Sequence, residues 1–209
     1  MTAAKHLENL NALKLILDRN TRFLSLSGVS CILAGVFATL GMITATYIYG
    51  AEWELFTSYT LQESMEAFIP FFVIASGVIG LTIGCCYYMT KSNIRKKKEP
   101  INKELLKNTV INILIPILVG GVLCLIALWE GKFNHLAAYM LIFYGLGLFS
   151  GGKFIYNDIK IVGLVFVALG VVSYLHPQWS IYLWTIGFGL VHIIYGARIY
   201  TKYERNLQA

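Results

Sequence analysis

His192 is the clearest ionisable side chain inside an apolar stretch of this sequence. It stands in Gly189-Leu190-Val191-His192-Ile193-Ile194, well within a long uncharged segment. An imidazole titrates close to physiological pH, so His192 could sense or relay protons, or ligate haem or a metal. The plainer interpretation is a neutral imidazole that hydrogen-bonds a neighbouring helix.

Asn112 and Pro116 lie four residues apart in another uncharged segment. Proline cannot donate the helical hydrogen bond that the Asn112 carbonyl would accept, and interrupted helices build binding sites in transporters. We therefore group Asn112 and Pro116 with His192 as a candidate intramembrane polar site. The alternative is a simple proline kink, which membrane helices tolerate.

His135 and His176 fall at the outer ends of two predicted spans, and Glu130 lies in the loop before His135, so the three form a candidate outer cluster. If the three side chains meet, they could sense acid or bind a metal; otherwise the histidines are unrelated and exposed. The cysteines, Cys31, Cys85, Cys86 and Cys124, lack zinc-site spacing. Neither HExxH, Walker, GxSxG nor CxxC motifs occur. We therefore assign no catalytic residue and no metal site. The sequence does not indicate which cofactor, if any, is bound, and we expect a protein that is not an enzyme.

The elements that must position these residues are membrane-spanning helices. Hydrophobic residues make up 57% of the 209 residues and charged residues only 13%, about half the share in soluble domains. Four uncharged segments each suit one span of about 20 residues, and a fifth is long enough for two if it turns at Pro177. We predict an all-α polytopic bundle over 23–200, with spans at about 23–49, 67–90, 108–129, 134–152, 160–175 and 179–200.

Lysine and arginine placement predicts the orientation of the bundle. Of the 17 basic residues, only Lys132 falls on the opposite side from the N-terminus. The positive-inside rule then places both termini in the cytoplasm, and we expect a multi-pass protein of the inner (plasma) membrane. The densest basic run is Arg95-Lys96-Lys97-Lys98, which would attract anionic lipid headgroups or a protein partner. The positive charge is explained by topology, and no nucleic-acid motif accompanies it.

Two segments outside the spans have their own patterns. Residues 1–22 contain an amphipathic helix over 4–18, which would lie on the inner membrane surface or pack on the bundle. Its apolar face consists of Leu7, Leu10, Leu13 and Leu17. The loop 50–66 combines aromatic and acidic residues, as an interfacial cap or an outer ligand-gathering surface would. Residues 201–209 form a cytoplasmic tail.

A glycine pattern recurs along the chain. The second, fourth and sixth spans share Gly-x6-Gly-x3-Tyr, ending at Tyr88, Tyr156 and Tyr200, and the first and fifth spans share the glycine step alone. The third span departs from the pattern. Seven residues are close to two helical turns, so each glycine pair shares a face where helices can approach closely. We predict three helical hairpins as parallel repeats. The glycines expected to pack the helices are Gly77 and Gly84, Gly145 and Gly152, Gly163 and Gly170, and Gly189 and Gly196.

The segment Gly163–Arg198, with a glycine step, a turn at Pro177 and a second glycine step, resembles the hairpin repeat of the HdeD-like acid-resistance membrane proteins. The resemblance implies a six-span protein of three hairpins with a stress-linked role, and it supplies no catalytic residues. Our first hypothesis is a non-enzymatic membrane protein with a stress-response or partner-binding role, which includes homo-oligomers. The alternatives are a small-molecule transporter or channel around Asn112, Pro116 and His192, and a membrane enzyme or haem- or quinone-binding protein.

Overall fold

The computed structural model describes residues 27–49, 61–97, 103–154 and 157–204, and the regular structure within those ranges is entirely helical. Six of its helices are long and apolar enough to cross a membrane, which confirms the predicted class of protein. The predicted amphipathic helix at 4–18 and the C-terminal tail from 205 onward lie outside the described residues. So does the first part of the loop predicted at 50–66.

The first three spans are single helices, and the later ones are built from shorter pieces. The chain begins with α2 (Gly28–Tyr49), α3 (Leu61–Lys97) and α4 (Lys103–Trp129). The next two spans comprise η2 (Phe133–His135), α5 (Leu136–Gly151), η3 (Gly152–Phe154) and α6 (Asn157–Leu175). The last span is η4 (Pro177–Trp179), α7 (Ser180–Thr185), η5 (Ile186–Val191), α8 (His192–Ile199) and η6 (Tyr200–Glu204).

Helix boundaries differ from the predicted spans where polar residues extend a helix beyond its apolar part. α3 begins at Leu61, so residues 61–66 are helical and the expectation of a loop through 66 was wrong there. The turn between α4 and α5 uses Gly131, whose φ of 70° suits a residue without a side chain. Pro177 opens η4 as the turn between α6 and the last span, where a missing amide proton costs nothing.

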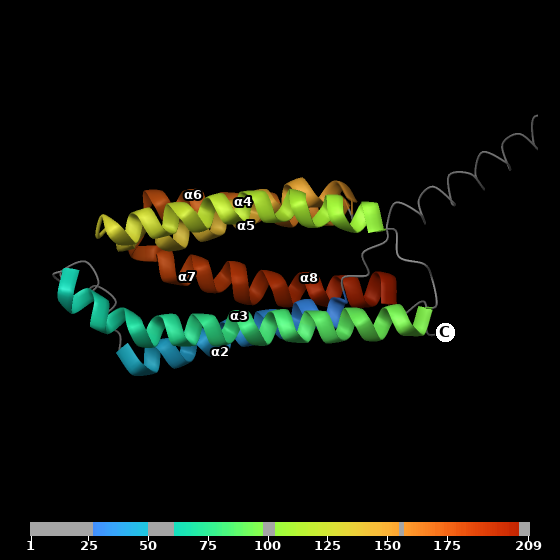
Figure 1. The fold of residues 1–209 in the computed structure, drawn as a ribbon, viewed down its shortest axis with the longest axis horizontal. Coiled ribbons are helices and arrows are strands. Elements are labelled where there is room, and N and C mark those ends of the chain that lie inside the picture. Colours follow the sequence, from blue (N-terminus) through green and yellow to red (C-terminus); the bar gives the residue numbers. More distant parts are fainter. Residues whose placement is uncertain (1–26, 50–60, 98–102, 155–156, 205–209) are drawn as a thin grey trace, which may run out of the picture.

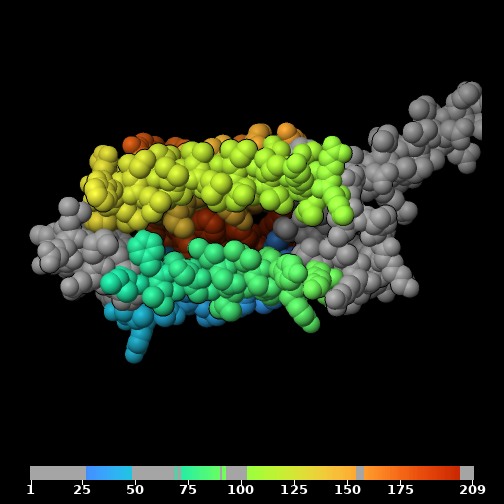
Figure 2. All heavy atoms as spheres, viewed as in Figure 1, coloured from blue at the N-terminus to red at the C-terminus, as the bar shows by residue number. Residues whose placement is uncertain are grey.

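The helices form an open arrangement with α3 and α4 at its two ends. In Figure 1, α4, α5 and α6 run along one side, α2 and α3 along the other, and α7 and α8 lie between them. α3 packs on α2, α2 on α8, α6 on α5, and α5 on α4. The space-filling view shows the molecule hollowed between α3 and α4 (Figure 2). None of the apolar stretch Phe72–Met89 of α3 is buried, which agrees with that opening.

Glycine steps bring two helix pairs together backbone to backbone. A Cβ atom at Gly145 of α5 would lie 2.6 Å from the carbonyl oxygen of Gly163 in α6. In the same way, a Cβ at Gly196 of α8 would lie 2.6 Å from the Gly28 oxygen of α2. Both contacts join helices of different predicted hairpins, and they let the backbones of α5 and α6, and of α2 and α8, approach closely.

The second glycine of the step in α6 also packs against α5. A Cβ at Gly170 would lie 2.6 Å from the Ile142 side chain and 2.8 Å from the Ile142 backbone nitrogen. Gly163 and Gly170 therefore face the same helix at two levels, as a shared helical face requires, and any larger side chain at Gly170 would displace α5. At both positions a side chain would therefore meet atoms of α5.

Two further glycines of the predicted set meet side chains. A Cβ at Gly152, where η3 begins, would lie 2.9 Å from the Lys160 Cγ atom of α6. A Cβ at Gly189 of the last span would lie 2.6 Å from the Thr39 hydroxyl oxygen of α2. Because both neighbours are side chains of another helix, these glycines also permit close helix contact.

The copy of the pattern in α3, at Gly77 and Gly84, meets no neighbouring helix in the described part of the chain, so a packing role for these two glycines stays a prediction. A Cβ at either glycine would have no atom of the described residues within 4 Å. α3 instead meets α2 through another face, where Val78 packs against Gly41.

Candidate intramembrane binding site

The last span changes its helical geometry immediately before His192. Residues Ile186–Val191 form the π-helical segment η5, and His192 begins α8. Gly187 and Gly189 are buried in this segment; a Cβ at Gly187 would lie 2.7 Å from a Leu141 methyl group. The two glycines thus let the last span approach its neighbours closely. Short π-helical segments inside α-helices often occur at functional sites.

His192 forms hydrogen bonds with both of its ring nitrogens. Its Nε2 atom lies 2.8 Å from the Tyr144 hydroxyl oxygen on α5, and its Nδ1 atom lies 3.2 Å from the carbonyl oxygen of Gly187. The Tyr144 contact joins α5 to the last span inside the membrane. An imidazole bonded to a neighbouring helix is the plainer of the two interpretations that the sequence allowed.

Aromatic rings surround the Tyr144–His192 pair. Trp184, Phe188 and His192 are spaced four residues apart and so lie along one face of the last span. The Phe188 ring centroid lies 5.0 Å from that of Tyr144 and 4.9 Å from that of Trp184. Phe166 of α6 lies beneath the pair, with its centroid 5.4 Å from the His192 ring, and it is fully buried. Aromatic side chains therefore contact the polar pair from two helices. Phe166 belongs to α6, and Phe188 belongs to the last span.

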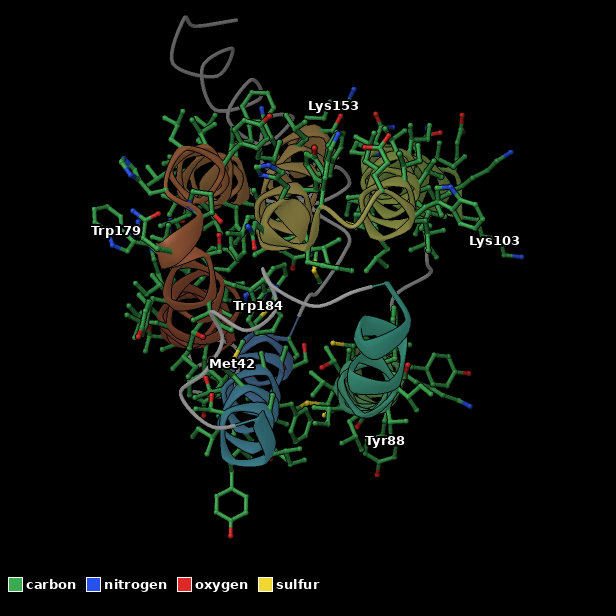
Figure 3. The ribbon with its side chains drawn as sticks, turned by 90° about the vertical axis from the view of Figure 1, so that its left-hand side faces the viewer. Met42, Tyr88, Lys103, Lys153, Trp179 and Trp184 are labelled. Carbon is green, nitrogen blue, oxygen red and sulfur yellow. The ribbon has the colours of Figure 1, made fainter. Side chains whose placement is uncertain are left out.

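The pair belongs to helices that border the hollow between α3 and α4. Tyr144, Phe188 and His192 are each half-buried, although they lie in the interior of the bundle. Helices α5 and α8 are visible at the bottom of the hollow in Figure 2. In Figure 3, Trp179 points away from the bundle, whereas Trp184 lies toward the space enclosed by the helices. Measured along the last span at about 1.5 Å per residue, His192 lies about 22 Å from Pro177 at one end and about 15 Å from Lys202 at the other.

Cysteines of two other helices lie near the same hydroxyl. Cys31 of α2 and Cys86 of α3 both lie in the neighbourhood of Tyr144. All four cysteines are free thiols in the structure.

Asn112 and Pro116 do not join this group. The Asn112 side chain donates a hydrogen bond of 2.7 Å to the Asn108 carbonyl of its own helix. α4 continues through Pro116 from Lys103 to Trp129 without a break in the helix. Within the described ranges, no hydrogen bond links either residue to His192. The sequence reasoning missed Tyr144, because a phenol in an apolar span carries no charge pattern that would single it out.

The three residues of the candidate outer cluster each have a separate partner. Glu130 forms an ion pair with Lys132, with 2.7 Å between Oε2 and Nζ. His135 stacks on Tyr174 with ring centroids 4.6 Å apart, and its buried Nδ1 atom has no hydrogen-bond partner in the described part of the chain. His176 packs on Trp179, with centroids 4.8 Å apart. No group of three or more His, Cys, Asp or Glu side chains among the described residues could hold a metal ion.

Charged residues at the other end of the bundle join α6 to the last span. Asp158 Oδ2 lies 3.0 Å from Lys202 Nζ and 3.7 Å from Arg198 Nε. Of the candidate inner basic cluster, Arg95, Lys96 and Lys97 belong to the last turn of α3, and Lys98 lies outside the described residues. The side chains of this cluster are likewise outside the described part of the structure, so their attraction to anionic lipid or a protein partner stays a prediction.

A separate open hollow of about 350 Å³ lies between α2 and α7. It is lined by Thr39, Met42, Ile43, Thr46, Tyr47 and Thr185. The hydroxyl groups of its three threonines donate to carbonyls of their own helices. The hollow therefore offers mainly apolar surface to a ligand, and it lacks the specific polar groups of the Tyr144–His192 site.

No family model matches this chain, and no curated protein or solved structure is significantly similar to it.

Proposed function

We propose that this protein is a non-enzymatic membrane protein that binds an amphiphile dissolved in the bilayer, with the amphiphile's polar end at Tyr144. The observation that carries the proposal is the Tyr144–His192 hydrogen bond of 2.8 Å, which lies among aromatic rings and joins α5 to α8, the two helices visible at the bottom of the hollow between α3 and α4. Binding sites for small ligands are typically apolar with a few placed polar groups. The hollow opens sideways, so an apolar tail would extend into the lipid.

Binding is favoured over the alternatives of haem ligation and transport. Both nitrogens of His192 are already hydrogen-bonded, so a haem iron would have to displace Tyr144 from Nε2. The residues expected to line a transport pathway, Asn112 and Pro116, have no hydrogen bond to His192 among the described residues. A single polar pair in an aromatic setting is enough to hold and orient one ligand.

Native mass spectrometry of the protein in mild detergent tests the proposal. We expect a bound lipid-like species at fixed stoichiometry in the parent protein and its loss in the double variant Tyr144→Phe/His192→Phe. Tyr182→Phe is the matched control, because Tyr182 is on the same span but 67% exposed. A bare polypeptide mass in the parent, or an adduct that the double variant retains, would refute binding at this place.

A second candidate function, the binding of another membrane helix, is favoured by one specific observation. Gly77, Gly80 and Gly84 share an exposed face of α3, and a Cβ at any of them would meet no described atom within 4 Å. Gly80 and Gly84 have the Gly-x3-Gly spacing of membrane-helix dimers. The partner proposed here is a second copy of the chain.

Energy transfer between labelled copies in lipid vesicles tests this second candidate. Gly80→Ile with Gly84→Ile should abolish the transfer. Gly121→Ile on α4 is the control, because that glycine is equally open. Transfer that is absent from the parent protein, or equally reduced in the control, would rule out a dimer through α3.

The proposal also includes the orientation of the bundle in the membrane, its hairpin repeats and a stress-linked role. Termini in the cytoplasm of an inner (plasma) membrane are supported by the basic residues, of which only Lys132 is placed outside. Three parallel hairpin repeats are supported by the recurring glycine step. A stress-linked role follows only from the resemblance of the last hairpin to HdeD-like proteins, and growth of a deletion strain at low pH tests it.

A further inference from the structure

The Gly187 carbonyl determines the direction of the hydrogen bonds at His192. A carbonyl oxygen can only accept, so the Nδ1 atom 3.2 Å away must carry the proton. A charged imidazole is costly inside a membrane, and a neutral ring has one donor and one acceptor. Nε2 is therefore the acceptor, and the Tyr144 hydroxyl donates its single proton to it across 2.8 Å.

Tyr144 is consequently an acceptor toward anything that enters the hollow. Its proton is used, while lone pairs of its oxygen remain, and no other hydrogen bond joins this oxygen to the described residues. Donation to the imidazole also polarises the hydroxyl and makes its oxygen a better acceptor. A ligand group that can only accept would place its lone pairs against those of Tyr144.

Other groups around the pair do not reverse this preference. The indole N–H of Trp184 is a donor, but the Trp184 ring packs against Phe188, and no contact of it with Tyr144 or His192 is found among the described residues. The neighbours placed around Tyr144 and His192 are Phe166, Phe188, Cys31 and Cys86, none of which carries a charge. An anionic headgroup would thus lie uncompensated in an apolar setting, which is costly.

We infer that the site selects an amphiphile whose polar end is a neutral hydroxyl group, which donates a hydrogen bond to the Tyr144 oxygen. This inference rests on the proposed function and specifies its ligand class. Two kinds of compound share that chemistry. One is a hydroquinone, whose flat ring would also stack on the aromatic side chains of the last span, and the other is an aliphatic lipid alcohol.

Paired probes that differ only in the hydroxyl proton test the inference. The probes are 1-hexadecanol and its methyl ether, and an alkyl hydroquinone and its dimethyl ether, titrated into the purified full-length protein. We expect each hydroxyl compound to bind about tenfold more tightly than its ether, the size expected for one buried hydrogen bond. Tighter binding of the hydroquinone than of hexadecanol identifies the ring compound as the source, and the reverse order identifies the lipid alcohol.

The variant His192→Phe shows whether the preference for the hydroxyl compound over its ether comes from the direction of the hydrogen bond or only from how the probes partition into the apolar phase. The substitution keeps an aromatic ring beside Phe188 and frees the Tyr144 proton, so the ether gains a donor and the preference should fall to within about twofold. Tyr182→Phe should retain the tenfold preference. A ratio that is equal in the parent and in His192→Phe overturns the inference and leaves the proposed function intact, whereas failure of all four probes to bind the parent refutes both.

A measurement on the unliganded parent protein tests the direction of the hydrogen bond without relying on the folding of a variant. In ¹⁵N NMR spectra of the histidine-labelled parent protein, the His192 signals should show a proton on Nδ1 and none on Nε2. A proton on Nε2 would overturn the inference, whatever the behaviour of the substituted protein.

Discussion

The Tyr144 hydroxyl stabilises the protein because it satisfies the half-buried His192 acceptor on another helix. In Tyr144→Phe, the Nε2 atom of His192 loses its donor, and the described residues provide no other hydrogen bond to it. An unsatisfied buried polar group costs about 1–3 kcal/mol. We expect the free energy of unfolding in mixed detergent micelles to fall by that amount. Tyr182→Phe should change it by less than about 0.5 kcal/mol, and equal losses in both variants would show that the pair has no special role.

A second prediction at the residue scale concerns Lys132. The Glu130 carboxylate hydrogen-bonds the ammonium group and attracts it, which raises the pKa of Lys132. A pKa raised by folding means that the pair stabilises the protein below the unfolded pKa of lysine, and that this contribution is lost as pH rises through the folded pKa. In Glu130→Gln, an NMR titration should give a lower pKa for Lys132. An unchanged pKa would mean that the two groups do not pair in solution.

At the scale of helices, identical glycine steps have different roles that depend on the neighbouring helix. Gly145 faces the backbone of α6, where a Cβ would lie 2.6 Å from the Gly163 oxygen, whereas a Cβ at Gly77 of α3 would meet no described atom within 4 Å. Gly145→Ala should therefore force α5 and α6 apart and reduce the free energy of unfolding by about 1–3 kcal/mol.

Gly77→Ala is the matched substitution for that experiment. With no steric conflict, alanine should stabilise α3 slightly, because glycine in a helix costs about 0.5–1 kcal/mol relative to alanine. Unfolding of both variants in the same micelles measures the difference. A loss of stability at Gly77 as large as that at Gly145 would mean that α3 has a packing partner on this face in the micelles, as the dimer proposed through Gly80 and Gly84 would provide.

For the whole molecule, the distribution of charge predicts which end of the bundle faces the cytoplasm. Single cysteines in a variant without the native ones, placed at Lys132 or Lys153, would report each side. In intact cells, a membrane-impermeant thiol reagent should label the cysteine at 132 and leave the one at 153 unmodified until the membrane is opened. The opposite pattern would invert the proposed orientation.

The sequence alone determined that this protein is a bundle of six membrane helices, because a span of about 20 uncharged residues leaves the chain few alternatives. It also located His192 as a polar residue inside the last span. It could not identify Tyr144, which is 48 positions away and becomes a partner only when α5 packs on the last span. Nor could it show which glycine steps are used, since Gly145 and Gly77 have the same local pattern. Spans follow from local composition, whereas hydrogen-bond partners and the open side between α3 and α4 depend on how distant helices pack, and that only the tertiary structure decided.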